Sequence, residues 1–140
     1  MANKTFHLEI VSPEGVSYSG EVSEVILPTT TGEIAVLPDH APLFTKLDAG
    51  EATVIVDKKK THIAIFGGFV EVLKHKVTVL SDYAVRADSI EIAKVEEAKK
   101  RAEEILEGKI ANEDFVVAEK ELQKALFSLK IADKMKRRTN

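Results

Sequence analysis

Apolar and polar residues alternate through the first half of the chain, as they do in a strand with one buried face. Phe6, Leu8 and Ile10 alternate with His7 and Glu9. Similar runs follow, separated by glycine, proline and Asp-Ala-Gly turn signals, and they predict strands over residues 16–19, 22–27, 33–37, 43–47, 52–56, 62–66, 69–73 and 77–80. Many short strands at this spacing predict an antiparallel β-sandwich or barrel over residues 1–86.

After residue 86 the apolar period becomes that of a helix. One face of the first predicted helix carries residues at steps of three and four, namely Val95, Ala98, Ala102 and Ile105. Asp88 and Glu91 have the spacing of an N-cap and its capping-box partner, and Gly108 suits the left-handed residue that ends a helix.

A second helix is predicted after Asn112, which suits an N-cap. Its apolar face carries Phe115, Ala118, Leu122, Ala125, Leu129 and Ala132. Residues 87–140 therefore predict an antiparallel αα-hairpin, which makes the chain an α+β protein in two parts. The alanine-rich seams bury little area, whereas Phe127 and Ile131 lie off the main seam and leave apolar surface for a third body. We expect the hairpin to dock on the sandwich or on a partner, with a small free-energy difference between the two states.

Composition narrows the class of protein. The 140 residues are 44% hydrophobic, which excludes disorder, and the formal net charge of −3 argues against nucleic-acid binding. The absence of cysteine removes disulfides, thiol catalysis and cysteine metal sites. The sequence has neither a signal-peptide pattern nor an apolar run of the roughly 20 residues that a membrane span needs, so we expect another protein to hold it at any membrane.

Catalytic patterns are missing from the sequence. It contains neither a phosphate-binding Gly-x-x-x-x-Gly-Lys-Ser/Thr loop nor a Gly-x-Ser-x-Gly elbow. His7, His40, His62 and His75 are scattered singly, without the spacing of zinc ligands. We therefore expect no active site, no metal and no cofactor of the chain's own.

Two basic segments remain. Lys58, Lys59 and Lys60 lie between two predicted strands, as a solvated turn or as a docking site for an acidic partner. Near the C-terminus only Asp133 opposes five cations, which are Lys130, Lys134, Lys136, Arg137 and Arg138. Some of these cations are explained by the helix dipole, but five within nine residues exceed what a helix end needs. We expect this end to contact an acidic surface.

Several segments together resemble a known family. Residues 31–43 read TGEIAVLPDHAPL, residues 67–72 read GGFVEV and residues 77–82 read VTVLSD. With the helical stretch 122–132 and the basic end, they resemble, in the same order along the chain, the ε subunit of F-type ATP synthases. The one departure in the first segment is Ala35, where glycine is common in the family.

The resemblance implies a non-catalytic subunit of the rotor. In that family the sandwich binds the γ subunit and rests on the membrane c-ring, so that both turn as the central stalk. Gly32 and Glu33 match the c-ring loop, and His40, Pro42 and Leu43 match the γ-facing surface. The family's place is the cytoplasmic face of the bacterial plasma membrane, where it is peripheral.

The hairpin of that family folds against the sandwich or extends between γ and the α/β catalytic head. When extended, it blocks rotation in the direction of ATP hydrolysis. The basic residues from Lys130 onward then match those that meet an acidic loop of the β subunit. The resemblance therefore implies that this hairpin inhibits hydrolysis.

Some members of the family bind ATP in the folded hairpin as a regulatory ligand. The matching positions here are Ile90, Glu91, Lys94, Arg101 and Lys124. The sequence departs from the motif because lysine stands where arginine forks bind phosphate, and bulkier Val95 and Ser128 also differ. ATP binding therefore stays open, and the capping box alone also accounts for Glu91.

Besides the rotor subunit, the residues leave a second class of function open. In this alternative the chain is a stand-alone ligand-binding β-sandwich whose hairpin mediates self-association. An enzyme would need a convergent polar cluster in a pocket, and the sequence offers no candidate. Stable binding to γ separates the first two classes.

Overall fold

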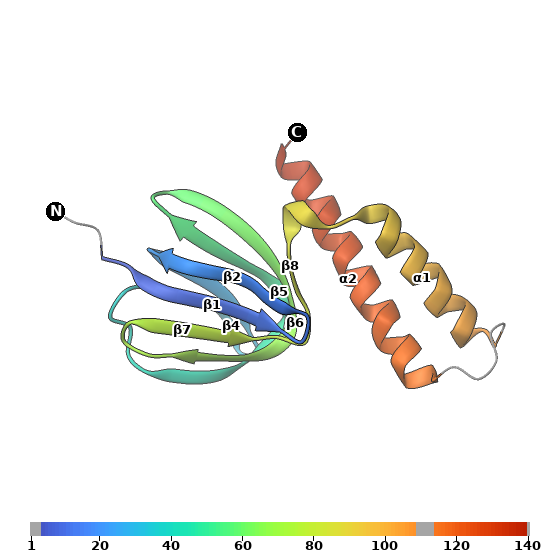
Figure 1. Cartoon of the computed structure of the whole chain (residues 1–140), viewed down its shortest axis with the longest axis horizontal. Coiled ribbons are helices and arrows are strands. Elements are labelled where there is room, and N and C mark those ends of the chain that lie inside the picture. The colour runs from blue at the N-terminus through green and yellow to red at the C-terminus, as the bar shows by residue number, and fades with distance from the viewer. Residues whose placement is uncertain (1–3, 109–113, 140) are drawn as a thin grey trace. The chain divides into compact units, whose positions relative to one another are not determined.

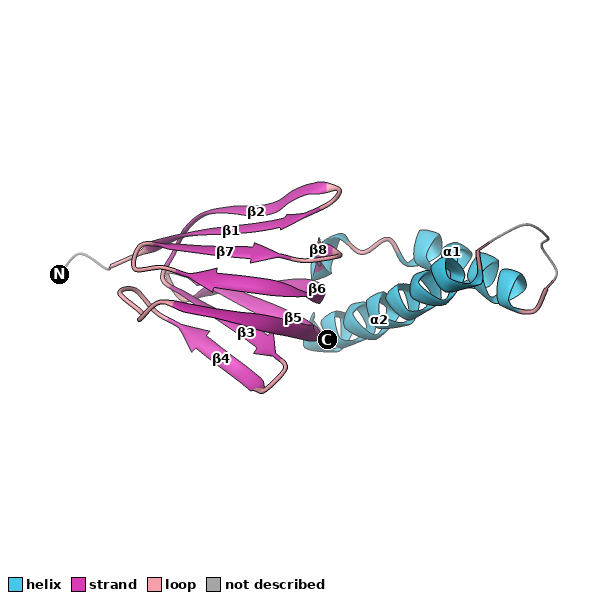
Figure 2. Ribbon diagram, turned by 90° about the horizontal axis from the view of Figure 1, so that it is seen from below, coloured by secondary structure: helices cyan, strands magenta, loops and turns pink. Residues whose placement is uncertain are grey.

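The computed structural model describes residues 4–108 and 114–139. The chain forms two compact units, one ending at Arg86 and the other beginning at Ala87. Figures 1 and 2 show the strands of the first unit and the helices of the second.

The first unit is a β-sandwich, as the alternating pattern predicts. Its strands are β1 (Phe6–Ser12), β2 (Gly15–Val22), β3 (Glu24–Thr29), β4 (Gly32–Val36), β5 (Leu43–Val56), β6 (Lys59–Val72), β7 (Lys76–Leu80) and β8 (Ala84–Arg86). Hydrogen bonds connect them in the order β2-β1-β7-β6-β5-β3-β4, and β8 pairs with β6. Neighbouring strands are antiparallel except for β1 and β7, which run parallel. The fold class predicted from the sequence is confirmed.

Strands β5 and β6 are each 14 residues long, whereas the sequence predicts two short strands in place of each. The first part of β6 pairs with β8 and its last part pairs with β7, so the strand passes from one layer of the sandwich to the other. Gly67 and Gly68 have φ of 76° and 110° at this point. The prediction of a turn was wrong here because these glycines bend the strand without ending it.

The core lies between the layers of the sandwich. Its largest fully buried side chains include Phe6, Leu8, Ile10, Leu27, Leu47, Ile63 and Ile65. On β1, the apolar residues at every second position are buried and those between them are half-buried. The period-two pattern therefore identifies the core face of this strand correctly. Burial of these side chains and of the other core residues is the main stabilising term of the unit.

The second unit begins with a short 3₁₀ turn, η1 (Ala87–Ser89), and helix α1 (Ile92–Leu106). Asp88 lies in the 3₁₀ turn, and Glu91 occupies the N-cap position of α1 without a side-chain cap hydrogen bond. The predicted capping box is therefore wrong, because the 3₁₀ turn moves the helix start beyond the reach of Asp88. Gly108 has φ of 78° and its N–H bonds to the Ile105 carbonyl at 3.0 Å, as expected of a helix end.

Helix α2 (Phe115–Thr139) is 25 residues long, about 37 Å at 1.5 Å per residue. The Asp114 carboxylate accepts a hydrogen bond of 2.8 Å from the Val116 N–H and so caps its start. The predicted cap, Asn112, lies outside the described residues.

The buried face of α2 differs in part from the predicted seam. Three predicted alanines are buried, namely Ala118, Ala125 and Ala132. Ser128 and Ile131 are buried as well, whereas Phe115 is 56% exposed. The placement of Ile131 on spare surface was therefore wrong, because steps of three from Ala125 widen the buried face to include Ser128 and Ile131.

Candidate functional site

An apolar band crosses the outer face of the sandwich. It consists of Val16, Val11, Leu80, Phe69 and Phe44, hereafter the apolar band. The strand register places Val16 opposite Val11, Val11 opposite Leu80, and Leu80 opposite Phe69, so these four side chains share one face. The Phe44 and Phe69 rings stack with centroids 5.6 Å apart and an interplanar angle of 11°. The band therefore continues from β2 to β5 without interruption.

Most side chains of the apolar band face water. Phe44 is 67% exposed, Val16 61%, Leu80 56% and Phe69 45%. A surface hollow of about 560 Å³ lies beside Phe69 and Leu80 and is also lined by Pro13, Lys46 and Asp82. Single exposed apolar residues are ordinary on protein surfaces, but a continuous row of large ones marks a docking site.

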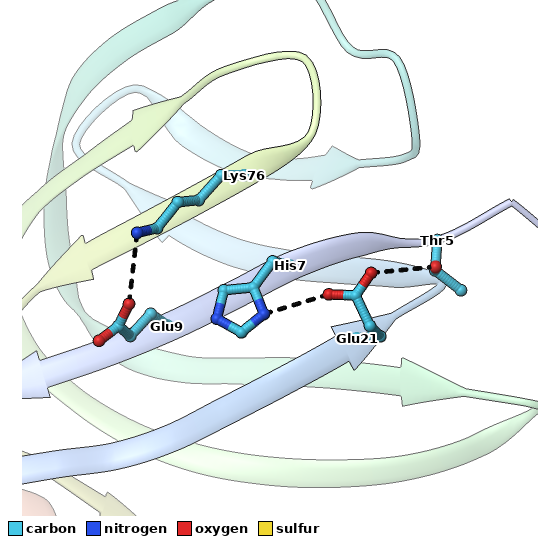
Figure 3. A network of polar contacts seen from close by, with 5 residues as sticks. All are labelled: Thr5, His7, Glu9, Glu21 and Lys76. Atoms are coloured by element: carbon cyan, nitrogen blue, oxygen red, sulfur yellow. Dashed lines mark hydrogen bonds and ion pairs between the residues drawn. The ribbon is translucent and has the colours of Figure 1, made fainter.

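The same face becomes polar toward the start of β1. There, the His7 Nδ1 atom lies 3.1 Å from Glu21 Oε2, and the Thr5 hydroxyl donates to Glu21 Oε1 at 3.3 Å (Figure 3). Lys76 Nζ lies 3.5 Å from Glu9 Oε2. Because His7, Glu9 and Val11 are two residues apart on one strand, this network and the apolar band lie on one surface. A partner docked on it would meet an apolar half and a charged half.

The residues that match the γ-facing surface lie beside this face. Pro42 is exposed, and the half-buried His40 places its Nδ1 2.6 Å from the carbonyl oxygen of Ala41. Leu43 packs against the core, so the next residue, Phe44, is the one that faces outward. The sequence reasoning missed Phe44, Phe69 and Leu80. The alternating pattern could have identified them, because each is a large apolar residue at an outward-facing position next to an inward-facing one.

The residues that match the c-ring loop begin β4, directly after the two-residue turn that follows β3. Gly32 has φ of 123°, and the Thr29 hydroxyl donates to its carbonyl oxygen. Glu33 is exposed and lies opposite Pro28 in the register. Ala35, the residue that departs from the family pattern, lies within β4 opposite Ile26.

The five cations near the C-terminus are all exposed on α2. Steps of three and four bring Lys130, Lys134 and Arg137 to one face of the helix, with Arg138 beside them. Lys136 points about 200° away from Lys134 at 100° per residue and so lies on another face. Asp133 forms a salt bridge with Arg137, whose Nε lies 3.2 Å from Asp133 Oδ2. Lys130, Lys134, Arg137 and Arg138 are hereafter the basic face.

The residues that match the ATP motif make contacts of their own. Lys94 Nζ lies 3.1 Å from Glu91 Oε2 on the exposed surface of α1, and Lys124 Nζ lies 4.0 Å from Glu121 Oε1. Arg101 borders a hollow of about 210 Å³ between α1 and α2 that Ala98, Ala102, Asp114 and Glu121 also line. Ile90 is half-buried. The structure thus brings Glu91 and Lys94 together as a local ion pair.

Two histidines of the sandwich contact acidic residues. His62 Nδ1 lies 3.0 Å from Glu51 Oε1 and 3.3 Å from the Thr53 hydroxyl oxygen, and His7 contacts Glu21. Within residues 4–108 and 114–139, no group of three histidine, aspartate or glutamate side chains has the arrangement of a metal site. No helix in this part of the chain is long and apolar enough to cross a membrane.

A sandwich with an exposed apolar band, followed by a helical hairpin with a basic end, defines a docking module. Residues 5–87 match the family described as ATP synthase, Delta/Epsilon chain, beta-sandwich domain. The ATP synthase epsilon chain of Caldanaerobacter subterraneus subsp. tengcongensis is 44% identical over 133 residues, which cover 94% of this chain and 96% of that relative. The epsilon chain of Chloroflexus aggregans is 42% identical over 134 residues, with the same two coverages. The chain therefore belongs to the ATP synthase epsilon chain family.

Solved structures share the fold. A chain in the cryo-EM structure of the Euglena gracilis mitochondrial ATP synthase (OSCP/F1/c-ring) superposes with a TM-score of 0.61 at 22% identity, and the match covers 97% of this chain and 82% of that one. A chain in the central stalk/c-ring structure of the Tetrahymena thermophila mitochondrial ATP synthase gives a TM-score of 0.54 at 13% identity, with coverages of 94% and 99%.

Proposed function

We propose that this protein is a non-catalytic rotor subunit of an F-type ATP synthase that binds the γ subunit through the apolar band. The observation that carries the proposal is the stacked pair Phe44–Phe69, which lies in an exposed row with Leu80. Water-exposed aromatic rings stabilise a complex when a partner covers them, since burial of apolar area is the main favourable term of association. The role requires no active site or cofactor of the chain's own.

Gly32 and Glu33, which follow the turn between β3 and β4, are the proposed contact with the c-ring. Both residues are exposed, and the positive φ of Gly32 fixes a tight turn that presents Glu33 to the partner. His40, Pro42 and Leu43 form the edge of the γ contact in this proposal, with Phe44 as its first residue on the outer face. The complex holds the protein peripherally at the cytoplasmic face of a bacterial plasma membrane.

The hairpin is the proposed inhibitor of ATP hydrolysis. Its basic face carries Lys130, Lys134, Arg137 and Arg138, and Arg137 forms a salt bridge with Asp133. Complementary charge on the α/β catalytic head would orient the helix on docking, since interfacial charges fix register and partner choice. ATP is not needed for this inhibition, and Glu91 and Lys94, which match the family's ATP motif, instead pair with each other.

Calorimetric titration of the protein into its cognate γ subunit tests the proposal, after circular dichroism has verified the folding of both. We expect saturable one-to-one binding with a negative heat-capacity change, which is the signature of apolar burial. Lack of binding between two folded partners would contradict the rotor role. It would favour a stand-alone sandwich whose hairpin self-associates, and sedimentation of the protein alone would then test that alternative.

A further inference from the structure

A third hollow, of about 390 Å³, lies at the end of the sandwich next to the proposed γ contact. It is lined by Lys4, Thr5, Pro38, Asp39, Lys74 and His75, which come from three separate segments of the chain. The backbone holds two of these segments together, because the His7 N–H donates to the His75 carbonyl oxygen at 2.9 Å. The third segment leads directly into His40 and Pro42. The hollow and the proposed docking loop therefore share one stretch of backbone.

The lining has a surplus of positive charge. Lys4 Nζ lies 3.0 Å from Asp39 Oδ2, and Asp39 is the one carboxylate among the six lining residues. Lys74 is exposed and has no ion pair with another residue in the described part of the chain. Two lysines thus face a single carboxylate, even without a proton on His75. Lys4, Lys74 and His75 line the hollow together with Asp39, and they lower the Asp39 pKa, first through the Lys4 hydrogen bond and charge.

The backbone around Asp39 holds its carboxylate in the hollow. Its φ is 64°, in the left-handed region that aspartate tolerates better than most residues. The His40 N–H bonds to the Leu37 carbonyl at 3.2 Å and closes the turn around it. The chain's own carboxylate therefore neutralises part of the charge and leaves Lys74 for a second anionic group.

We propose that this hollow receives an acidic side chain of the protein that docks on residues 40–44. The inference rests on the proposed function and adds to it the chemistry of one contact point, a partner carboxylate paired with Lys74. Charge complementarity and the shared backbone with the docking loop favour a protein carboxylate as the occupant. Such a pair at the rim of an interface sets the register and the association rate more than the total affinity.

Three variants of the full chain test the proposal by titration with the cognate γ subunit. Lys74→Glu should weaken binding about fivefold or more, since it replaces attraction by repulsion at a partly exposed pair. Lys59→Glu, at the exposed first residue of β6, makes the same change in net charge and should change the Kd less than about twofold. Asp39→Asn should tighten binding, because it removes the competing carboxylate. All three positions are exposed, so each variant should fold.

The outcomes separate this inference from the proposed function. If wild-type protein does not bind γ, the proposed function fails. If wild type binds while Lys74→Glu and Lys59→Glu have equal effects, only a long-range field acts and the hollow receives no carboxylate. In about 1 M salt the Debye length falls to about 3 Å, and the difference between the two lysine variants should shrink. A difference that is equally large in high salt would also overturn the ionic contact.

Discussion

Gly68 approaches the backbone of Leu80 so closely that no other residue fits in its place. A Cβ on Gly68 would lie 2.0 Å from the Leu80 carbonyl oxygen and 2.7 Å from Ser81 Cα. The contact forms where β6 bends from one layer of the sandwich to the other, just before Phe69 pairs with Leu80. The glycine therefore links the bend of the fold to the apolar band.

Substitution of this glycine should destabilise the sandwich. Gly68→Ala should lower the free energy of unfolding by roughly 2–4 kcal/mol, because a methyl group meets backbone atoms and φ is 110°. Gly20→Ala is the matched control, since the atoms nearest its Cβ are those of Tyr18 at 3.9 Å. Urea denaturation followed by circular dichroism measures both. Equal midpoints for the two variants would show that the close approach does not constrain the fold.

The apolar band should act in binding and not in folding. Phe69→Gln should weaken γ binding by about 30-fold, the effect of losing a 2 kcal/mol hot spot, and change the unfolding midpoint little. Phe69 is 45% exposed, and its ring stacks on that of Phe44. Leu126→Gln, at an equally exposed leucine of α2, is the control. Calorimetry that gives unchanged affinity for Phe69→Gln would exclude the band as the docking surface.

Much of the sandwich follows from local pattern, but its docking face does not. Phe6, Leu8 and Ile10 are identified as core because polar residues separate them. Leu43 and Phe44 are neighbours of similar hydrophobicity, and only the pairing of Leu43 with Val72 decides which of them faces inward. The family resemblance points to Leu43 for the partner surface, and the strand register turns its neighbour Phe44 outward.

A glycine pair is also ambiguous in the sequence, since it can end a strand in a turn or bend a strand that continues. At residues 67–68 the two outcomes depend on whether the chain continues in the other layer, which is a tertiary property. In the hairpin, Asp88 and Glu91 have capping-box spacing. Asp88, however, lies within the 3₁₀ turn at Ala87–Ser89, so it does not occupy the N-cap position of α1. Short-range signals of this kind fix the type of an element better than its ends.

The Lys4–Asp39 pair should be visible in the titration of Asp39. The pKa of this carboxyl lies below its ordinary value, chiefly because Lys4 donates a hydrogen bond to it and places a positive charge nearby. A depressed folded-state pKa contributes stability that is present above the unfolded pKa and is lost as the pH falls through the folded pKa. Carboxyl-detected NMR should find the Asp39 pKa raised toward its ordinary value in Lys4→Gln. An unchanged Asp39 titration in that variant would show that the pair does not persist in solution.

The cap of α2 should contribute measurably to the hairpin. Asp114→Ala removes the acceptor of the Val116 N–H and should cost about 1 kcal/mol, within the range of 0.5–2 kcal/mol for N-cap losses. Glu119→Ala is the control, because it changes an exposed position in the same helix. Thermal unfolding followed at 222 nm compares the two. A cap loss no larger than that of the control would show that the hydrogen bond is replaced by water without cost.

The proposed inhibition by the hairpin makes a prediction about one face of α2. In the reconstituted complex, a chain that ends at Arg86 should raise ATP hydrolysis and leave γ binding intact, because the apolar band lies wholly in the first unit. Lys134→Gln should raise hydrolysis in part, since Lys134 lies between Lys130 and Arg137 on the basic face.

Lys136→Gln is the matched control for that helix. It removes the same charge two residues away, on another face, and should leave hydrolysis near the wild-type rate. Steady-state ATPase assays at equal occupancy of the complex measure all four proteins. If Lys134→Gln and Lys136→Gln raise hydrolysis equally, the helix acts through its overall charge and not through a defined contact. If the chain ending at Arg86 leaves hydrolysis unchanged, the hairpin is not the inhibitor.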